Sequence, residues 1–229
     1  MKPNFIKRLF IKTFANQLRK PSGLLAKKVG NKMNEINGFL YDFTIDTMKL
    51  TDNNTILEIG FGNGNFFDKL FSKAKLLKIS GLDFSKEMVS AATKNNSEAI
   101  SSGNLNLKFG GSDKIPFPDN SFDKVFCINV IYFWEQPDKH LKEIFRVLKP
   151  NGKFYSAIRT KESMLQMPFV NYGFTIYTQQ EWINILEQNK LKFTDAFKNS
   201  EPEVELNGNH YNLESLCIIA EKFNTTNIN

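Results

Sequence analysis

Between residues 55 and 158 the sequence alternates short β-rich runs with amphipathic helical patterns. Each strand-like run is short and apolar, and a segment with helical spacing of its apolar residues separates most of them from the next. This alternation predicts parallel strands joined by right-handed helical crossovers, the pattern of a doubly wound α/β fold. The runs are TILEIG, LKISGLD, LNLKFGG, SFDKVFCINV and GKFYSAI.

The C-terminal part of the chain breaks this alternation. After a helical pattern at 179–188, LKFTDAFKN and ESLCIIAEK read as two strands with no helix between them. Two such strands predict an antiparallel hairpin at one edge of the sheet. We therefore expect an α/β fold: a Rossmann-like, doubly wound, seven-stranded and mostly parallel sheet with a C-terminal antiparallel hairpin.

The N-terminal 50 residues have no strand pattern. Apolar residues recur at helical spacing from Phe5 to Leu18, with Lys and Arg between them, and Pro21 to Gly23 should end this helix. A second helical pattern covers about 29–50. The predicted organisation is 1–50 as added N-terminal helices, 51–223 as the α/β domain and 224–229 as a polar tail.

Charge is unevenly distributed along the chain. Of the 30 Lys and Arg residues, nine precede the first acidic residue, Glu35, which leaves 21 against all 24 acidic residues in the remainder. The basic helix has three open interpretations: a packing arm of the domain, a contact with anionic lipid, or a contact with nucleic acid, the last being the least favoured.

Chain length, cysteine content and the lengths of the apolar stretches limit the class of protein. A length of 229 residues suits one sizeable domain. Cys127 and Cys217 both sit in apolar runs and suggest neither a disulfide framework nor a metal site. No stretch approaches the roughly 20 apolar residues that span a bilayer. The expected location is cytoplasmic, with peripheral membrane association left open.

The first strand-like run leads directly into three glycines. Gly60, Gly62 and Gly64 form GxGxG, whereas dinucleotide sites have GxGxxG, and Glu58 precedes them by two residues. Glycines at such a turn let a ligand approach the main chain. Because a carboxylate repels phosphate and suits an ammonium group, the turn favours a cofactor with an amino acid end and no phosphates.

The segment ILEIGFGNG resembles the first motif of class I S-adenosylmethionine-dependent methyltransferases, and the resemblance runs from about Thr55 to Lys222. It implies S-adenosylmethionine as cofactor, with S-adenosylhomocysteine as product. It also implies that Gly60, Gly62 and Gly64 line the methionine portion of the cofactor and that Glu58 lies near the amino group of the cofactor.

Asp83 ends the second strand-like run, 19 residues after Gly64. An acid at this place accepts hydrogen bonds from a ribose diol. The resemblance agrees, and it places Phe84 and Met88 beside the adenine. The alternative is that Asp83 or Ser85 only caps the following helix.

The segment from Gly110 to Val130 resembles methyltransferases that act on quinones, sterols and other small molecules. In that group an acid after the third strand meets the adenine amino group, which implies Asp113 here, with Ser112 making a backbone contact. The stretch PFPDNSFD is interpreted as a structural turn. Asn129, at the end of the fourth strand, is expected to face the cofactor.

Candidates for the acceptor side are aromatic. Tyr132 and Trp134 follow the fourth strand, and Tyr172 and Tyr177 belong to an insertion at 159–177 that could form a lid or simply cover the sheet. The segment NVIYFW lacks the two prolines typical of methyltransferases that act on nucleobase or glutamine nitrogen, so those substrates are disfavoured.

No residue is assigned to catalysis. Methyl transfer from a sulfonium is an in-line displacement that positioning alone can accelerate. His140 is expected to be solvent-exposed and His210 to lie in a loop, so neither is named as a general base.

The expected function is methyl transfer to a small acceptor that is apolar or associated with a membrane. The alternatives are an RNA or protein methyltransferase, or a catalytically silent protein that binds S-adenosylmethionine. The oligomeric state is left open.

Overall fold

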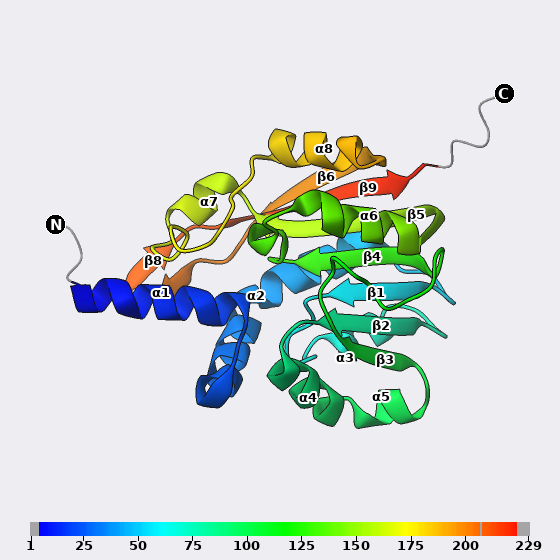
Figure 1. Cartoon of the computed structure of the whole chain (residues 1–229), viewed down its shortest axis with the longest axis horizontal. Helices are drawn as coiled ribbons and strands as arrows, with labels where there is room; N and C mark the ends of the chain where they lie inside the picture. Colours follow the sequence, from blue (N-terminus) through cyan, green and yellow to red (C-terminus); the bar gives the residue numbers. More distant parts are fainter. Residues whose placement is uncertain (1–4, 207, 224–229) are drawn as a thin grey trace.

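The computed structural model describes residues 5–206 and 208–223, so the predicted polar tail at 224–229 lies outside the described residues. Seven strands form one sheet in the order β3-β2-β1-β4-β5-β9-β6 (Figure 1). The strands are β1 (Thr55–Ile59), β2 (Lys78–Asp83), β3 (Leu105–Phe109), β4 (Phe122–Ile128), β5 (Leu148–Arg159), β6 (Leu191–Ser200) and β9 (Glu214–Lys222). The predicted seven-stranded, mostly parallel sheet is confirmed.

Eight α-helices and two short 3-10 helices accompany the sheet in the described part of the chain. The α-helices are α1 (Phe5–Arg19), α2 (Ala26–Met48), α3 (Phe67–Phe71), α4 (Lys86–Asn95), α5 (Ser97–Ser101), α6 (Pro137–Val147), α7 (Lys161–Leu165) and α8 (Gln179–Gln188), and the 3-10 helices are η1 (Gly23–Leu25) and η2 (Ile131–Phe133). Among these described helices, none combines the length and the apolar character needed to cross a bilayer.

The two faces of the sheet carry different helices because side chains alternate along each strand. Leu57 and Val125 point into a core built with α6 and α8, whereas Ile56 and Phe126 point into a second core built with α2, α3 and α4. In Figure 1, α6 lies in front of the sheet and α2 passes behind it. The continuous apolar runs of the sequence are explained by this burial on both faces.

The C-terminal strands form the predicted antiparallel pair. β9 lies between β5 and β6 and is antiparallel to both, so β6 becomes the outer strand. The connection from β6 to β9 carries a further small hairpin, β7 (Val204–Leu206) and β8 (Asn209–Tyr211). A loop is expected around His210 from the sequence, and the structure places this residue in β8 instead.

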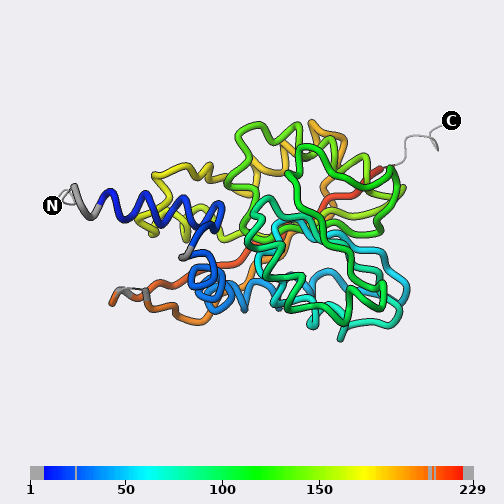
Figure 2. Tube along the Cα trace, turned by 60° about the horizontal axis from the view of Figure 1, so that its bottom comes forward, coloured from blue at the N-terminus to red at the C-terminus, as the bar shows by residue number. Residues whose placement is uncertain are grey.

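The N-terminal helices lie along one end of the sheet. Figure 2 shows α1 extending away from the domain, between the segment that follows α7 and the β7–β8 hairpin. α1 packs through Ala15, which is 1% exposed, and through Phe14, whose ring meets that of Phe169 edge-on at 5.9 Å. α2 is a single helix of 23 residues, and it packs on β5 and β9.

A buried ion pair joins α2 to the C-terminal strands. Arg159, at the end of β5, donates from Nε and Nη2 to the two carboxylate oxygens of Glu201, at 2.9 and 2.8 Å. Its Nη2 also donates to the carbonyl oxygen of Ile36 in α2, at 2.8 Å. The Arg159 and Glu201 side chains are 8% and 1% exposed. Bidentate geometry of this kind fixes the guanidinium in one orientation.

We expect Arg159→Met to lower the free energy of unfolding by about 3–5 kcal/mol, because it leaves the Glu201 carboxylate buried without a partner. Urea unfolding followed by circular dichroism measures this change. Lys69→Met is the matched control, since Lys69 pairs with Asp42 at the surface and should contribute less than about 1 kcal/mol. Equal losses in the two variants would show that the buried pair does not tie α2 to the sheet.

Candidate functional site

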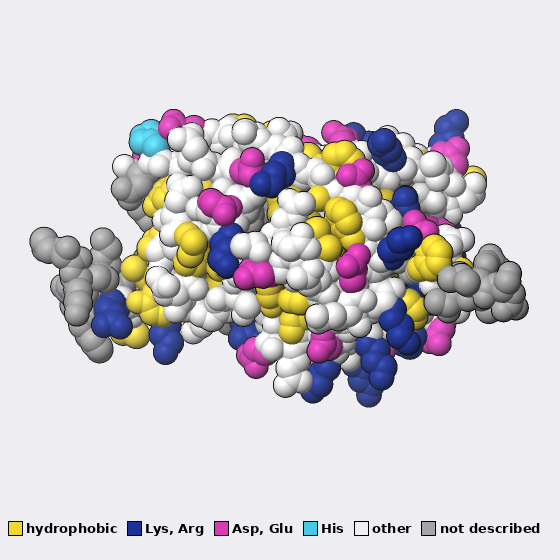
Figure 3. Space-filling model, turned by 90° about the horizontal axis from the view of Figure 1, so that it is seen from above, with side chains coloured by type: hydrophobic (Ala, Val, Ile, Leu, Met, Phe, Trp, Pro, Cys, Tyr) yellow, Lys and Arg dark blue, Asp and Glu magenta, His cyan; other side chains and the backbone are white. Residues whose placement is uncertain are grey.

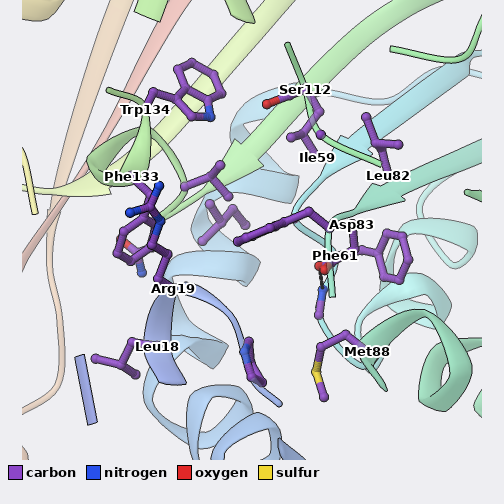
Figure 4. A pocket seen from close by; sticks show the side chains of 18 of the residues that line it. Leu18, Arg19, Ile59, Phe61, Leu82, Asp83, Met88, Ser112, Phe133 and Trp134 are labelled. Atoms are coloured by element: carbon purple, nitrogen blue, oxygen red, sulfur yellow. Dashed lines mark hydrogen bonds between the residues drawn. The ribbon is translucent and has the colours of Figure 1, made fainter. Parts of the chain in front are cut away.

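A cavity of about 360 Å³ opens at the carboxyl ends of β1, β2 and β4. Ligands of open α/β sheets bind at this edge, outside the carboxyl ends of the strands. The turn after β1, the end of β2 and the segment after β3 line one part of the cavity (Figure 4). The rest is lined by α1, α2, the end of β4 with η2, and the start of α6. Residues far apart in the sequence therefore meet around one space.

The glycine turn after β1 contains two glycines that line the cavity, and each is required for a different reason. Gly60 has φ +79°, and a Cβ there would lie 2.5 Å from Cγ2 of Val130, so this glycine lets the turns after β1 and β4 pack together. Gly62 has φ +59°, and a Cβ there would meet no atom within 4 Å. The space beside Gly62 is open for a ligand.

The third glycine has a packing role. Gly64 does not line the cavity, and a Cβ there would lie 2.8 Å from both Cβ of Ala92 and Nδ2 of Asn96. It lets the turn approach the end of α4. Of the three glycines expected to line the methionine portion of the cofactor, Gly60 and Gly62 border the cavity and Gly64 does not.

Asp83 projects from the end of β2 toward the cavity (Figure 4). Its Oδ1 accepts from the backbone N–H of Ser85 at 2.8 Å, and its Oδ2 accepts from that of Gly62 at 2.9 Å. Each carboxylate oxygen keeps a further lone pair for a ligand. Burial raises the pKa of Asp83 to about 6, and the two N–H donors oppose that rise.

The residues expected near an adenine also line the cavity. Phe84 and Met88 follow Asp83, and Ser112 and Asp113 follow β3. The Ser85 side chain accepts from the N–H of Met88 at 3.3 Å, so Ser85 caps α4 as the alternative interpretation proposed, while Asp83 still faces the cavity. Asn129, with φ +56°, lines the cavity as well.

His140 differs from its expected position. It is half-buried and lines the cavity, where its Nδ1 lies 2.8 Å from Oγ of Ser112 and its ring stacks on Trp134 at 4.7 Å between centroids. Burial lowers the pKa of His140, so the ring is neutral at pH 7. The expectation of solvent exposure is wrong because α6 begins directly over the end of β4.

Glu58 does not line the cavity. It is 2% exposed, and its Oε1 accepts a hydrogen bond from the hydroxyl of Tyr41 at 2.7 Å. Tyr41, from α2, lines the cavity in its place. Sequence spacing alone gave no reason to expect that a residue from α2 would separate Glu58 from the ligand space.

Residues of α1, α2 and η2 close the other side of the cavity. Leu18, Arg19 and Phe133 lie across from Asp83 and Met88 in Figure 4. Arg19 donates from Nη2 to Oε1 of Glu135 at 3.1 Å, an exposed ion pair that ties the end of α1 to the segment after η2. The sequence predicted the two N-terminal helices but did not indicate which of their residues would form this wall.

Of the aromatic candidates for an acceptor site, only Trp134 lines the cavity. Tyr132 is buried. Its hydroxyl donates a hydrogen bond to the carbonyl oxygen of Arg159 and accepts one from the N–H of the same residue. Tyr177 packs against Trp182 with 5.2 Å between ring centroids. Neither these two residues nor Tyr172 reaches the cavity.

Comparison with known proteins identifies similar chains. Residues 57–156 match the family model described as a methyltransferase domain. The chain is 32% identical over 126 residues to the putative methyltransferase YrhH of Bacillus subtilis, an alignment that covers 55% of this chain and 69% of that relative. It is 35% identical over 130 residues to the ubiquinone/menaquinone biosynthesis C-methyltransferase UbiE of Rickettsia bellii, covering 54% of this chain and 52% of that relative.

The fold also matches solved structures. A SAM-dependent methyltransferase from Aquifex aeolicus superposes with a TM-score of 0.65 at 22% identity. The superposition covers 86% of this chain and 97% of that one. At this identity the match supports the fold.

We expect Glu58→Gln to stabilise the protein relative to wild type, increasingly so as pH rises from about 5 to 8. Burial raises the pKa of Glu58 from 4.5 to about 8, so the folded protein keeps a proton that the unfolded chain loses within this window. Stability of the wild type therefore falls with rising pH, by up to about 1.4 kcal/mol per pH unit from this group. Thermal melting of both proteins across the window measures the difference, and a constant gap would contradict the assignment.

Proposed function

Since the chain belongs to the class I S-adenosylmethionine-dependent methyltransferases, we propose that it transfers a methyl group to a small apolar acceptor that binds between the cofactor and the N-terminal helices. The observation that carries this proposal is the cavity wall made by Leu18, Met33 and Phe133, which faces the Asp83 side. Apolar walls with a few polar groups suit a small apolar molecule.

The residues on the Asp83 side fit the cofactor. The free lone pairs of the Asp83 carboxylate suit the two hydroxyls of a ribose. The open space at Gly62 admits a ligand against the main chain. Phe84 and Met88 offer apolar surface to an adenine, and Ser112 and Asp113 offer polar groups to its edge.

The cofactor supplies a methyl group on a sulfonium, which an acceptor takes by in-line displacement. The chain's own contribution is to hold the acceptor close and aligned in a site that excludes water. Phe133, Met33 and Leu18 provide the dry wall, and the Arg19–Glu135 ion pair holds the end of α1 over it. Neutral His140 is the candidate proton acceptor within this cavity, if the acceptor atom carries a proton.

The similarity to the UbiE methyltransferase supports an apolar ring compound as the acceptor class. Because the chain spans about half the length of that relative, quinone methylation is a proposal for this protein. Aromatic residues outside the cavity lining support Phe133 of this wall: its ring meets that of Phe174 edge-on at 4.6 Å, and Phe169 packs on Phe174 at 5.3 Å between ring centroids.

Incubation with labelled S-adenosylmethionine and fractionated cell extract tests the reaction. We expect label in the organic-solvent fraction, with a product that mass spectrometry finds heavier by one methyl group. Label that disappears after nuclease or protease treatment would instead support RNA or protein as the acceptor.

We expect Asp83→Ala to weaken binding of S-adenosylhomocysteine by about tenfold or more. The reason is that hydrogen bonds to a charged carboxylate contribute about 1.5–3 kcal/mol to the free energy of binding. Isothermal titration calorimetry measures the affinity. Asp195→Ala, on the outer strand β6 and exposed, is the matched control. Unchanged affinity in Asp83→Ala would remove the ribose assignment.

Contact of α1 with an anionic membrane is a second proposal, favoured by the exposure of its outer face. Leu9 and Phe10 are 58% and 71% exposed, and the exposed Arg8 and Lys12 flank them. Figure 3 shows apolar side chains beside basic ones at the end of the molecule near the N-terminus. Apolar residues bordered by cations are typical of helices that lie on an anionic lipid surface.

We expect the protein to sediment with phosphatidylglycerol-containing vesicles at low salt and to bind several-fold less at high salt, since salt screens the attraction. A Leu9→Ser and Phe10→Ser double variant should bind several-fold less at either salt concentration. Neutral phosphatidylcholine vesicles are the control. Absence of sedimentation of the wild type at low salt would contradict the membrane contact and leave α1 as a packing arm.

A further inference from the structure

One face of α2 borders the cavity over three turns of helix. Its residues recur at helical spacing and are Gly30, Met33, Asn34, Asn37 and Tyr41. Two of them, Asn37 and Tyr41, are 9% and 6% exposed and have hydrogen-bond partners buried behind them. These partners decide which kind of polar atom each residue offers to a ligand.

Tyr41 can only accept a hydrogen bond from the cavity. Its single hydroxyl hydrogen is donated to Glu58, so the phenol oxygen keeps only lone pairs for a ligand. The ring is held by a stack on Phe66, with 3.8 Å between centroids and 19° between planes. A negatively polarised oxygen, with a carboxyl group directly behind it, faces the ligand space.

Asn37 offers the opposite polarity. Its Oδ1 accepts from Nη1 of Arg159 at 3.2 Å and from Nδ2 of Asn129 at 3.1 Å. A guanidinium has donors only, so it must face the oxygen of the amide, and this fixes the orientation of the side chain. Among the described residues, none accepts a hydrogen bond from Nδ2 of Asn37, which leaves an N–H donor at the cavity.

The two groups lie one helical turn apart. Residues four apart on a helix stand side by side, with about 5–6 Å between their Cβ atoms. The acceptor of this pair has the Glu58 carboxyl group behind it, and the donor has the Arg159 guanidinium behind it. This arrangement is complementary to a zwitterion, which carries an ammonium and a carboxylate on one carbon.

We propose that Tyr41 and Asn37 bind the amino acid end of the cofactor, the Tyr41 oxygen accepting from the ammonium group and the Asn37 amide donating to the carboxylate. The assignment rests on the proposed cofactor site and adds to it two residues of α2. Glu58 then acts through Tyr41 as a positioning residue and has no direct contact with the ligand. Arg159 has the same relation to Asn37.

The test compares two ligands that share the adenosine part. S-Adenosylhomocysteine carries the amino acid end, and 5′-methylthioadenosine lacks it. We expect Tyr41→Phe and Asn37→Ala each to weaken binding of S-adenosylhomocysteine by about tenfold or more, as loss of a hydrogen bond to a charged group does. Binding of 5′-methylthioadenosine should change less than about twofold, because the adenosine part is untouched. Isothermal titration calorimetry measures both.

Two further variants guard against structural effects. Glu58→Gln keeps the shape of the side chain but cannot ionise. Measured above about pH 8, where the wild-type carboxyl group is charged, it should also weaken binding of S-adenosylhomocysteine and spare binding of 5′-methylthioadenosine. Tyr155→Phe, a buried tyrosine of β5 away from the cavity, is the matched control and should leave both affinities unchanged.

Each outcome decides between alternatives. Equal weakening of both ligands in Tyr41→Phe and Asn37→Ala would overturn the proposal, because the residues would then only support the fold. Unchanged binding of S-adenosylhomocysteine would overturn it too, and would leave Asn37 for an oxygen atom of the acceptor. Wild-type protein that binds neither ligand would count against the proposed cofactor site itself.

Discussion

A single guanidinium at the end of β5 connects α2 to the segment that follows β6, and the backbone of the same residue connects to η2. Arg159 reaches Glu201 beyond β6, the carbonyl oxygen of Ile36 and the side chain of Asn37. Its own backbone exchanges hydrogen bonds with the hydroxyl of Tyr132. Because a buried charge must be neutralised where it stands, the positions of α2 and of the C-terminal strands are coupled through it. Removing any one partner would leave the others with unsatisfied polar groups.

This coupling bears on the α2 side of the cavity, where the lining side chains of α2 carry no charge. The cavity edge presents the phenol of Tyr41 and the amide of Asn37, while the ionisable groups that polarise them, Glu58 and Arg159, stay behind them and out of contact with solvent. Neutral groups at the surface cost less to strip of water than charges do. The carboxyl group of Glu58 and the guanidinium of Arg159 behind them still set the direction of the hydrogen bonds of Tyr41 and Asn37.

Much of the fold could be predicted from local pattern. The change from helical to strand periodicity located the sheet, and the missing helix between LKFTDAFKN and ESLCIIAEK indicated the antiparallel strands. Asp83 and the glycines were predicted because the ends of strands and the turns after them have recognisable local sequence patterns. Tyr41 and Asn37 were not found, since their partners lie 17 and 122 residues away. A polar Asn37 on the apolar face of a helix was the only trace in the sequence.

The outer and inner faces of α1 have a joint consequence for how a ligand could arrive. Leu9 and Phe10 face outward near the start of this helix, and Leu18, near the end of the helix, borders the cavity. Nine residues of helix from Leu9 to Leu18 span about 13 Å. The hydrocarbon core of a bilayer is about 30 Å thick. If α1 rested on a membrane surface, a molecule moving from Leu9 to the cavity at Leu18 would travel less than half that thickness. The length of α1 would then set the distance between the membrane and the site.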